Sequence, residues 1–187
     1  MTTNDIQNSI STWTAWANTH TDSRFDIALL KIWIQFEKFI AELFVNYATG
    51  ISSEEGFLPT LNLQFSSAEQ LNVFLREGTK KYVDYPKQIE KLSKHIFLND
   101  PFGVIFQDTN NKNAYDQIVA IRNYIAHESA EAKTKMIKLC FGGVESRFKE
   151  PNEFLKSIPR NQSQSYYGYY TQKIHDIAML LVNPPPP

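Results

Sequence analysis

Cysteine is nearly absent from this sequence, because Cys140 is the only one among 187 residues. A single cysteine excludes an intrachain disulfide and a cysteine-based zinc site, and it is typical of a reducing compartment. Glycine is scarce too, with seven residues, which disfavours a turn-rich all-β sandwich. The chain instead holds 42% hydrophobic and 13% aromatic residues, enough apolar mass to exclude a disordered protein.

Neither sign of charge is in excess. Lysine and arginine together number 19 and aspartate and glutamate 20, which leaves a formal net charge of −1. A domain that holds nucleic acid by its overall positive charge is therefore excluded. Binding to nucleic acid would have to use a local basic patch.

Long uncharged hydrophobic runs are missing as well. The most apolar segment, residues 25–47, contains Asp26, Lys31, Glu37, Lys38 and Glu42. These charges argue against a membrane span. The polar N-terminal residues also lack the basic stretch and apolar run of a secretory signal. We therefore expect a cytoplasmic protein that does not interact with a membrane.

A long helix is predicted between Asp22 and Gly50. Apolar residues recur there every three or four positions, at Phe25, Leu29, Ile32, Phe36, Phe39, Leu43 and Tyr47. This spacing places them on one helix face. Asp22 is a candidate cap at the start, and Gly50 can end the helix. Trp33, Ile40 and Phe44 widen the apolar stripe, so we expect this helix at the centre of a bundle.

Weaker patterns predict further helices before and after this one. Residues 6–17, 86–98 and 166–182 show apolar residues at helical spacing, and another helix opens at Asn113. Residues 99–111 are predicted to form a loop. We therefore expect an all-α protein with one domain over residues 1–183, and an exposed polyproline tail at 184–187 that cannot pack.

The run Arg122 to His127, RNYIAH, carries the functional argument. At about 100° per residue, Arg122 lies near the middle of the apolar arc of its predicted helix. Such a charge is costly without a partner, so Arg122 is either part of a structural ion pair or a site residue that faces a cleft. Glu37 lies inside the apolar arc of the long helix. We hypothesise that Glu37 and Arg122 pair, the alternative being that Glu37 reaches solvent at the edge of its arc.

Spacing along the helix separates the polar residues of this run. Asn123 and His127 are four apart and share a face. Arg122 and His127 are five apart and diverge by about 140° on an ideal helix. Both reach one phosphate only if the helix end deforms, with Glu128 and Ser129 as the candidate break, or if a second subunit completes the site.

The same run resembles the signature of the HEPN superfamily, an arginine followed by a polar residue, often asparagine, a short spacer and a histidine. Arg122, Asn123 and His127 occupy these positions. A chance match of this form in a chain of this composition has a probability of roughly 0.01. The resemblance implies a HEPN-like helical bundle, here with extra N-terminal and C-terminal helices.

The resemblance further implies a metal-independent RNA endonuclease without a cofactor, acting as a homodimer in which two motif copies face one cleft. Family members act as toxins or in defence against phage. The implied partners are RNA, a second copy of the chain, and an antitoxin or other regulatory protein. One variant of the family carries a tyrosine two residues past the histidine; Ser129 stands there in this chain, which puts regulation through that tyrosine in question.

The residue types suit metal-free RNA cleavage, in which the 2′-hydroxyl of the substrate attacks the adjacent phosphorus. Histidine is the side chain that exchanges protons near neutral pH, so His127 is the candidate acid–base catalyst. Arg122 can hold the phosphate and offset developing charge. Asn123 can orient the imidazole or bind a phosphate oxygen, with Glu37 in support. The four histidines are scattered, and no metal-ligand cluster is expected.

Basic residues directly after His127 form the candidate RNA-binding surface. They are Lys133, Lys135 and Lys138, at the start of a run with an excess of positive charge. The alternative is a solvated helix face without a ligand. Four tyrosines in residues 166–170 could stack on unpaired bases, but we expect them to pack against other helices.

Two rival interpretations stay open. In the first, Arg122, Glu37 and His127 form a buried polar network in a non-catalytic helical module that binds RNA or a protein partner. In the second, the motif matches by chance in an unrelated helical bundle. Cleavage of RNA in the presence of a chelator distinguishes them from the nuclease hypothesis.

Overall fold

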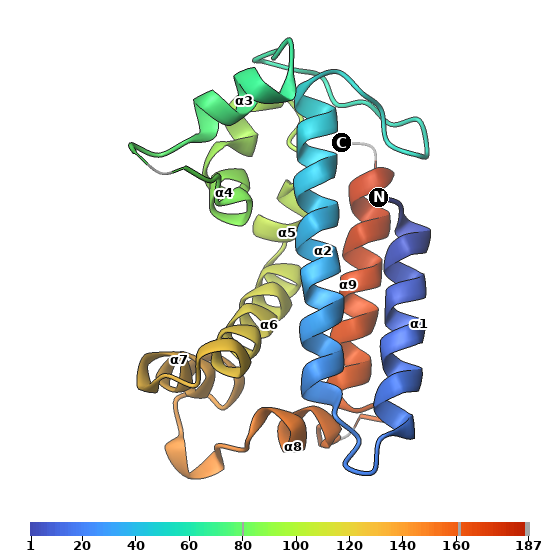
Figure 1. The fold of residues 1–187 in the computed structure, drawn as a ribbon, viewed down its shortest axis with the longest axis vertical. Coiled ribbons are helices and arrows are strands. Elements are labelled where there is room, and N and C mark those ends of the chain that lie inside the picture. The colour runs from blue at the N-terminus through green and yellow to red at the C-terminus, as the bar shows by residue number, and fades with distance from the viewer. Residues whose placement is uncertain (80, 161, 186–187) are drawn as a thin grey trace.

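The computed structural model describes residues 1–79, 81–160 and 162–185 (Figure 1). This part of the chain is all-α and contains no strand; Leu61 and Phe97 form only an isolated antiparallel bridge. In chain order, the helices are α1 (Thr3–Thr19), α2 (Phe25–Ala48), α3 (Ala68–Leu75), α4 (Tyr85–Ile96), α5 (Gly103–Phe106), α6 (Thr109–His127), α7 (Ala130–Cys140), the 3-10 helix η1 (Glu145–Arg147), α8 (Pro151–Lys156) and α9 (Tyr166–Val182).

Three long helices form the body of the molecule. Helices α1, α2 and α9 lie side by side, and each packs against the other two (Figure 1). Helix α6 crosses this layer, packs on α2 and α9, and carries α7 at its far end. Helices α3 and α4 project from the opposite end of α2. The start of α1 and the end of α9 lie at that same end of the molecule.

Helix α2 occupies the centre of the core, as its wide apolar stripe predicts. Trp33, Phe36, Phe44 and Tyr47 are all 0% exposed. The Tyr47 hydroxyl donates a hydrogen bond to the backbone carbonyl of Leu181 over 2.8 Å, which ties α2 to the last turn of α9. Burial of this many aromatic rings is the main contribution to the stability of the fold.

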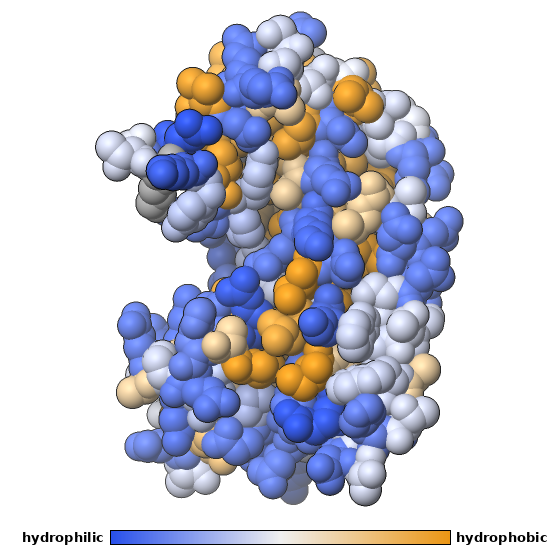
Figure 2. Space-filling view, in the orientation of Figure 1, coloured by the Kyte–Doolittle hydropathy of each residue, from blue (hydrophilic) through white to orange (hydrophobic). Residues whose placement is uncertain are grey.

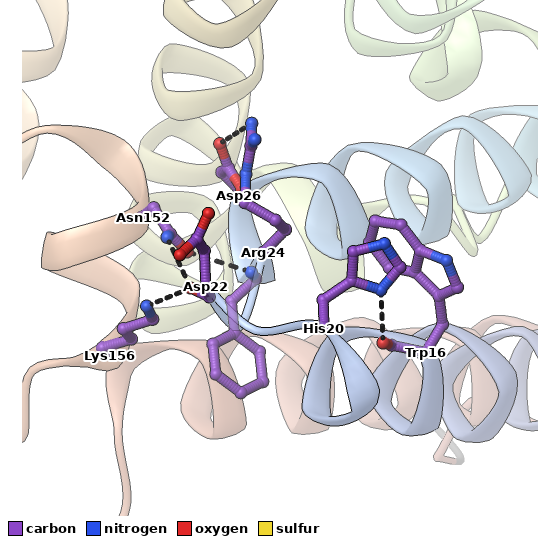
Figure 3. A network of polar contacts seen from close by, with 8 residues as sticks. Trp16, His20, Asp22, Arg24, Asp26, Asn152 and Lys156 are labelled. Carbon is purple, nitrogen blue, oxygen red and sulfur yellow. Dashed lines mark hydrogen bonds and ion pairs between the residues drawn. The ribbon is translucent and has the colours of Figure 1, made fainter.

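The start of α2 differs from the prediction that Asp22 caps it. The helix begins at Phe25, whose backbone N–H donates to the Oδ1 atom of Asn152 on α8 over 3.0 Å (Figure 3). Asp22 contributes its backbone carbonyl instead, which accepts hydrogen bonds from the side chains of Asn152 and Lys156. The capping group therefore comes from a helix more than 120 positions further along the chain, where sequence spacing does not reveal it.

Boundaries elsewhere follow local capping. Helix α9 has the bounds predicted from spacing. Helix α6 begins at Thr109, four residues before the predicted start, because the Oδ1 atom of Asp108 accepts the Asn111 N–H over 2.7 Å. The short helix α5 also lies within the predicted loop 99–111, so that loop prediction is wrong in part.

The predicted polyproline tail is exposed only in part. Pro184 is half-buried, and with Pro185 it lines a pocket beside Leu58 and Pro59. The prediction that the tail cannot pack is therefore wrong at Pro184. The rest of the predicted tail, residues 186–187, lies outside the described residues.

Candidate functional site

The run RNYIAH occupies the last two turns of α6. The helix stays regular through His127 and ends at Glu128, whose φ of 48° places it in the left-handed region. Ser129 then caps α7, and its Oγ atom accepts the backbone N–H of Ala132. The predicted break at Glu128 and Ser129 therefore exists, but it lies after the histidine. We refer to residues 122–138 as the α6–α7 corner.

Arg122 forms an ion pair with Glu37 of α2, as hypothesised from the sequence. Its Nη2 atom lies 3.3 Å from the Oε2 atom of Glu37. The side chains are 32% and 25% exposed, so the pair sits at the edge of the α2–α6 contact. The expectation that Arg122 lies in the middle of a buried arc is wrong, because the end of α6 extends beyond the core.

Asn123 holds the guanidinium from the other side. The Nη1 atom of Arg122 donates to the Oδ1 atom of Asn123 over 2.8 Å. Glu37 and Asn123 together fix the orientation of the guanidinium, while its other N–H donors have no hydrogen-bond partner in the described part of the chain. Such a group can still donate to a phosphate oxygen in a planar, two-pronged geometry.

His127 lies apart from this arrangement. Its side chain is exposed and forms no hydrogen bond or ion pair with any described residue. The Asn123 side chain accepts from Arg122, so it does not orient the imidazole in this structure. Because α6 stays helical through residue 127, the predicted divergence of Arg122 and His127 persists, and a single chain does not bring them to one phosphate.

The surface beside α6 is concave. Figure 2 shows a hollow between the part of the surface formed by α3 and α4 and the part formed by α6 and α7. Lys112 of α6 links the two parts through an ion pair with Glu90 of α4 at 3.0 Å, and it also binds Asp116. A long ligand such as a nucleic-acid strand could approach α6 from this side.

The three lysines after the motif have different surroundings. Lys133 is half-buried, with its Nζ atom 4.5 Å from the centroid of the Phe148 ring, a cation–π contact. Lys135 and Lys138 are exposed and make no ion pair within the described residues. The structure therefore leaves two of these charges free for a ligand and directs the third onto an aromatic ring.

Aromatic residues beside the motif are a feature that the sequence analysis missed. Tyr124 contacts Phe148 with ring centroids 5.8 Å apart, and Phe148 contacts Phe141 at 5.7 Å. Nothing in the spacing relates Tyr124 to Phe148, which follows η1 in an irregular segment. Burial, Glu150 and Glu128 together raise the pKa of Tyr124 above its ordinary value.

The tyrosines of α9 mostly pack, as expected. Tyr167 and Tyr170 are buried; the hydroxyl of the first contacts Thr14, and that of the second donates to the Oε1 atom of Gln117. Burial raises the pKa of the nearby Cys140 thiol to about 12, which disfavours its nucleophilic thiolate form at neutral pH.

The described residues hold neither a metal-binding cluster nor a membrane-spanning helix. No group of three or more His, Cys, Asp or Glu side chains is placed to hold a metal ion in residues 1–79, 81–160 and 162–185. None of the described helices combines the length and the apolar character needed to cross a bilayer.

Comparison of the chain with protein-family models found no match, and comparisons with curated proteins and with solved structures found none either. The motif residues and their surroundings are therefore the features from which a function can be inferred.

Proposed function

We propose that this protein is a metal-independent RNA endonuclease of the HEPN type. The observation that carries the proposal is the placement of two groups on the last turns of α6. Arg122 is oriented but only partly engaged, and His127 is exposed and unpartnered. These are the two chemical roles that cleavage through the 2′-hydroxyl requires, a phosphate-binding cation and a proton-transfer group.

The reaction has two coupled bond changes. His127 removes the proton from the 2′-hydroxyl, the oxygen attacks phosphorus, and the bond from phosphorus to the 5′-oxygen breaks. The leaving oxygen takes up a proton from water, which gives a 2′,3′-cyclic phosphate and a 5′-hydroxyl, and the protonated His127 returns its proton to the hydroxide that is left. Arg122 binds the phosphate and stabilises the charge that develops on it. Asn123 and Glu37 position the guanidinium.

The divergence of Arg122 and His127 supports a site made by two copies of the chain. In a homodimer, the arginine of one copy and the histidine of the other can face the same phosphate, with Lys135 and Lys138 of α7 guiding the strand. A role as a toxin or phage-defence effector is part of the proposal and rests on the resemblance.

The central experiment incubates purified protein with total RNA in EDTA. We expect cleavage that leaves cyclic phosphate ends and that falls by about 10²- to 10⁴-fold in His127→Ala. The matched control is His95→Ala, which removes an exposed histidine of α4. Cleavage that persists in His127→Ala, or RNA that stays intact with the wild-type protein, contradicts the proposal.

Mixing two inactive variants tests the composite site. If Arg122 and His127 act from different copies, a mixture of Arg122→Ala and His127→Ala chains, refolded together, regains part of the activity. If they act within one chain, the mixture stays inactive. Light scattering on the same samples reports whether a dimer forms at all.

A non-catalytic helical module that binds RNA or a protein is the second candidate. The Glu37–Arg122 ion pair favours it, because the carboxylate offsets the charge that a phosphate would bind. His127 does not join the buried network that this alternative predicts. Binding of RNA without cleavage, unchanged in His127→Ala, would support this candidate over the nuclease.

A further inference from the structure

A pocket of about 450 Å³ lies where the end of α7, η1, α8 and the start of α9 meet. Its volume is within the range of small-molecule sites. None of the motif residues 122–127 lines it. It is therefore a feature separate from the proposed catalytic groups.

Positive charge dominates the rim of this pocket. Arg147, Lys149 and Arg160 line it, and no carboxylate does. All three side chains are exposed and form no hydrogen bond or ion pair with the described residues. Some other cations among the described residues are paired, as Lys87 is with Glu77 at 2.8 Å. Three unpaired cations around one concavity form a site for an anion, with two guanidinium groups suited to phosphate oxygens.

The wall of the pocket is aromatic. Phe141 and Tyr166 both contact Phe154, with ring centroids 4.9 Å and 4.2 Å from its ring. The backbone N–H of Gly142, which also lines the pocket, makes no hydrogen bond to another backbone group in the described chain. At Gly142 φ is +64°, and a Cβ atom would meet nothing within 4 Å, so the backbone leaves open space here. The pocket thus combines unpaired cations with the partly exposed rings of Phe141 and Tyr166.

We propose that this pocket binds one nucleotide unit, with the phosphate among Arg147, Lys149 and Arg160 and the base against the aromatic wall. Aromatic surfaces and unpaired cations together are the features that bind unpaired nucleotides. The unit is either a free mononucleotide or part of a single strand. The contacts from Tyr124 through Phe148 to Phe141 join the pocket wall to the last turns of α6, so a strand can extend between the two sites.

This inference goes beyond the proposed nuclease, because binding here requires no cleavage. The test therefore uses the full chain with His127→Ala, and measures binding of 5′-AMP and of a short single-stranded oligoadenylate by calorimetry. Inorganic phosphate serves as a competitor. We expect Arg147→Gln combined with Arg160→Gln to weaken binding at least about tenfold. The matched control, Lys38→Gln combined with Lys94→Gln, removes two exposed charges elsewhere and should change affinity less than about twofold.

Each possible result either supports or overturns the proposal that this pocket binds a nucleotide. Binding of AMP that depends on Arg147 and Arg160 supports a free nucleotide as the ligand, and dependence seen only with the oligonucleotide supports a strand. Absence of binding by both ligands at millimolar concentration overturns the proposal, as does equal binding by the two double variants. If inorganic phosphate alone binds as tightly as AMP, the base makes no contribution and the nucleotide assignment is wrong. Perturbation of the Gly142 amide resonance locates the ligand independently of the variants.

Discussion

The three-helix layer and the α6–α7 corner differ in the burial and pairing of their polar side chains. In the layer of α1, α2 and α9, the buried Tyr47 hydroxyl is paired with the Leu181 carbonyl, while Ser9 Oγ and Trp33 Nε1 are buried without a hydrogen-bond partner among the described residues. In the corner, Arg122 is only partly paired and His127 is exposed without a partner. Fully satisfied polar groups stabilise a fold, whereas unsatisfied ones at its edge are available to a ligand. The three-helix layer therefore supplies most of the stability of the fold, and the α6–α7 corner carries the candidate catalytic groups.

The largest expected effect comes from emptying the core. Phe44→Ala removes a ring that is 0% exposed and that contacts Phe97 and Phe102 at 5.7 Å and 5.4 Å. It should lower the free energy of unfolding by about 3–5 kcal/mol, measured by denaturant titration. Phe74→Ala, at a ring that is 47% exposed, is the control and should cost less than about 1 kcal/mol. Similar losses in the two variants would remove the distinction between core and surface.

A smaller effect is expected from the buried hydroxyl of Tyr47. Tyr47→Phe leaves the Leu181 carbonyl without this donor and should cost about 1 kcal/mol at neutral pH. Burial raises the pKa of Tyr47 from 10.0 to about 12, so the folded state holds this proton more tightly than the unfolded state. The contribution is present below pH 10 and is lost as the pH rises toward 12.

Unfolding measured at several pH values checks this prediction. The wild-type protein should lose stability more steeply than Tyr47→Phe between pH 10 and 12, while other buried tyrosines contribute equally to both. Parallel curves would show that the Tyr47 hydroxyl does not titrate differently in the folded state.

The smallest effect is expected from the ion pair of the corner. Both side chains of the Glu37–Arg122 pair are partly exposed, so a double-mutant cycle with Glu37→Gln and Arg122→Ala should give a coupling energy of about 1 kcal/mol or less. The same Arg122→Ala variant should lose RNA cleavage while staying folded. A large loss of stability with unchanged cleavage would instead show that Arg122 has a structural role and no catalytic one.

Much of the fold follows from residue spacing. Helices α2 and α9 repeat apolar residues over many turns, which specifies both their existence and the faces they bury. The start of α6 was missed because its first turn, Thr109 to Asn113, is polar, and a single cap at Asp108 determines it. Short helices such as α5 and α8 have too few residues to show a repeat of apolar positions. Tertiary contacts determine whether these segments are helical.

The candidate site was predictable only in part. Two charges inside apolar arcs were enough to predict the Glu37–Arg122 pair, since each needs a partner. The role of Asn123 was not determined by its position, because its amide can bind either neighbour and the structure selects Arg122. The pocket formed by Arg147, Lys149 and Arg160 has no sequence signature, since separate short segments assemble it.

The junction in Figure 3 has a consequence for biosynthesis. The first backbone amide of α2 donates to Asn152 as well as to the nearby Ser23 carbonyl, and the Asp22 carbonyl of the preceding turn accepts from Asn152 and Lys156. A growing polypeptide emerges from the ribosome with its N-terminal part first. We therefore expect the amino end of the central helix to stay frayed on nascent chains that stop before residue 152, and to close only when most of the protein has been synthesised.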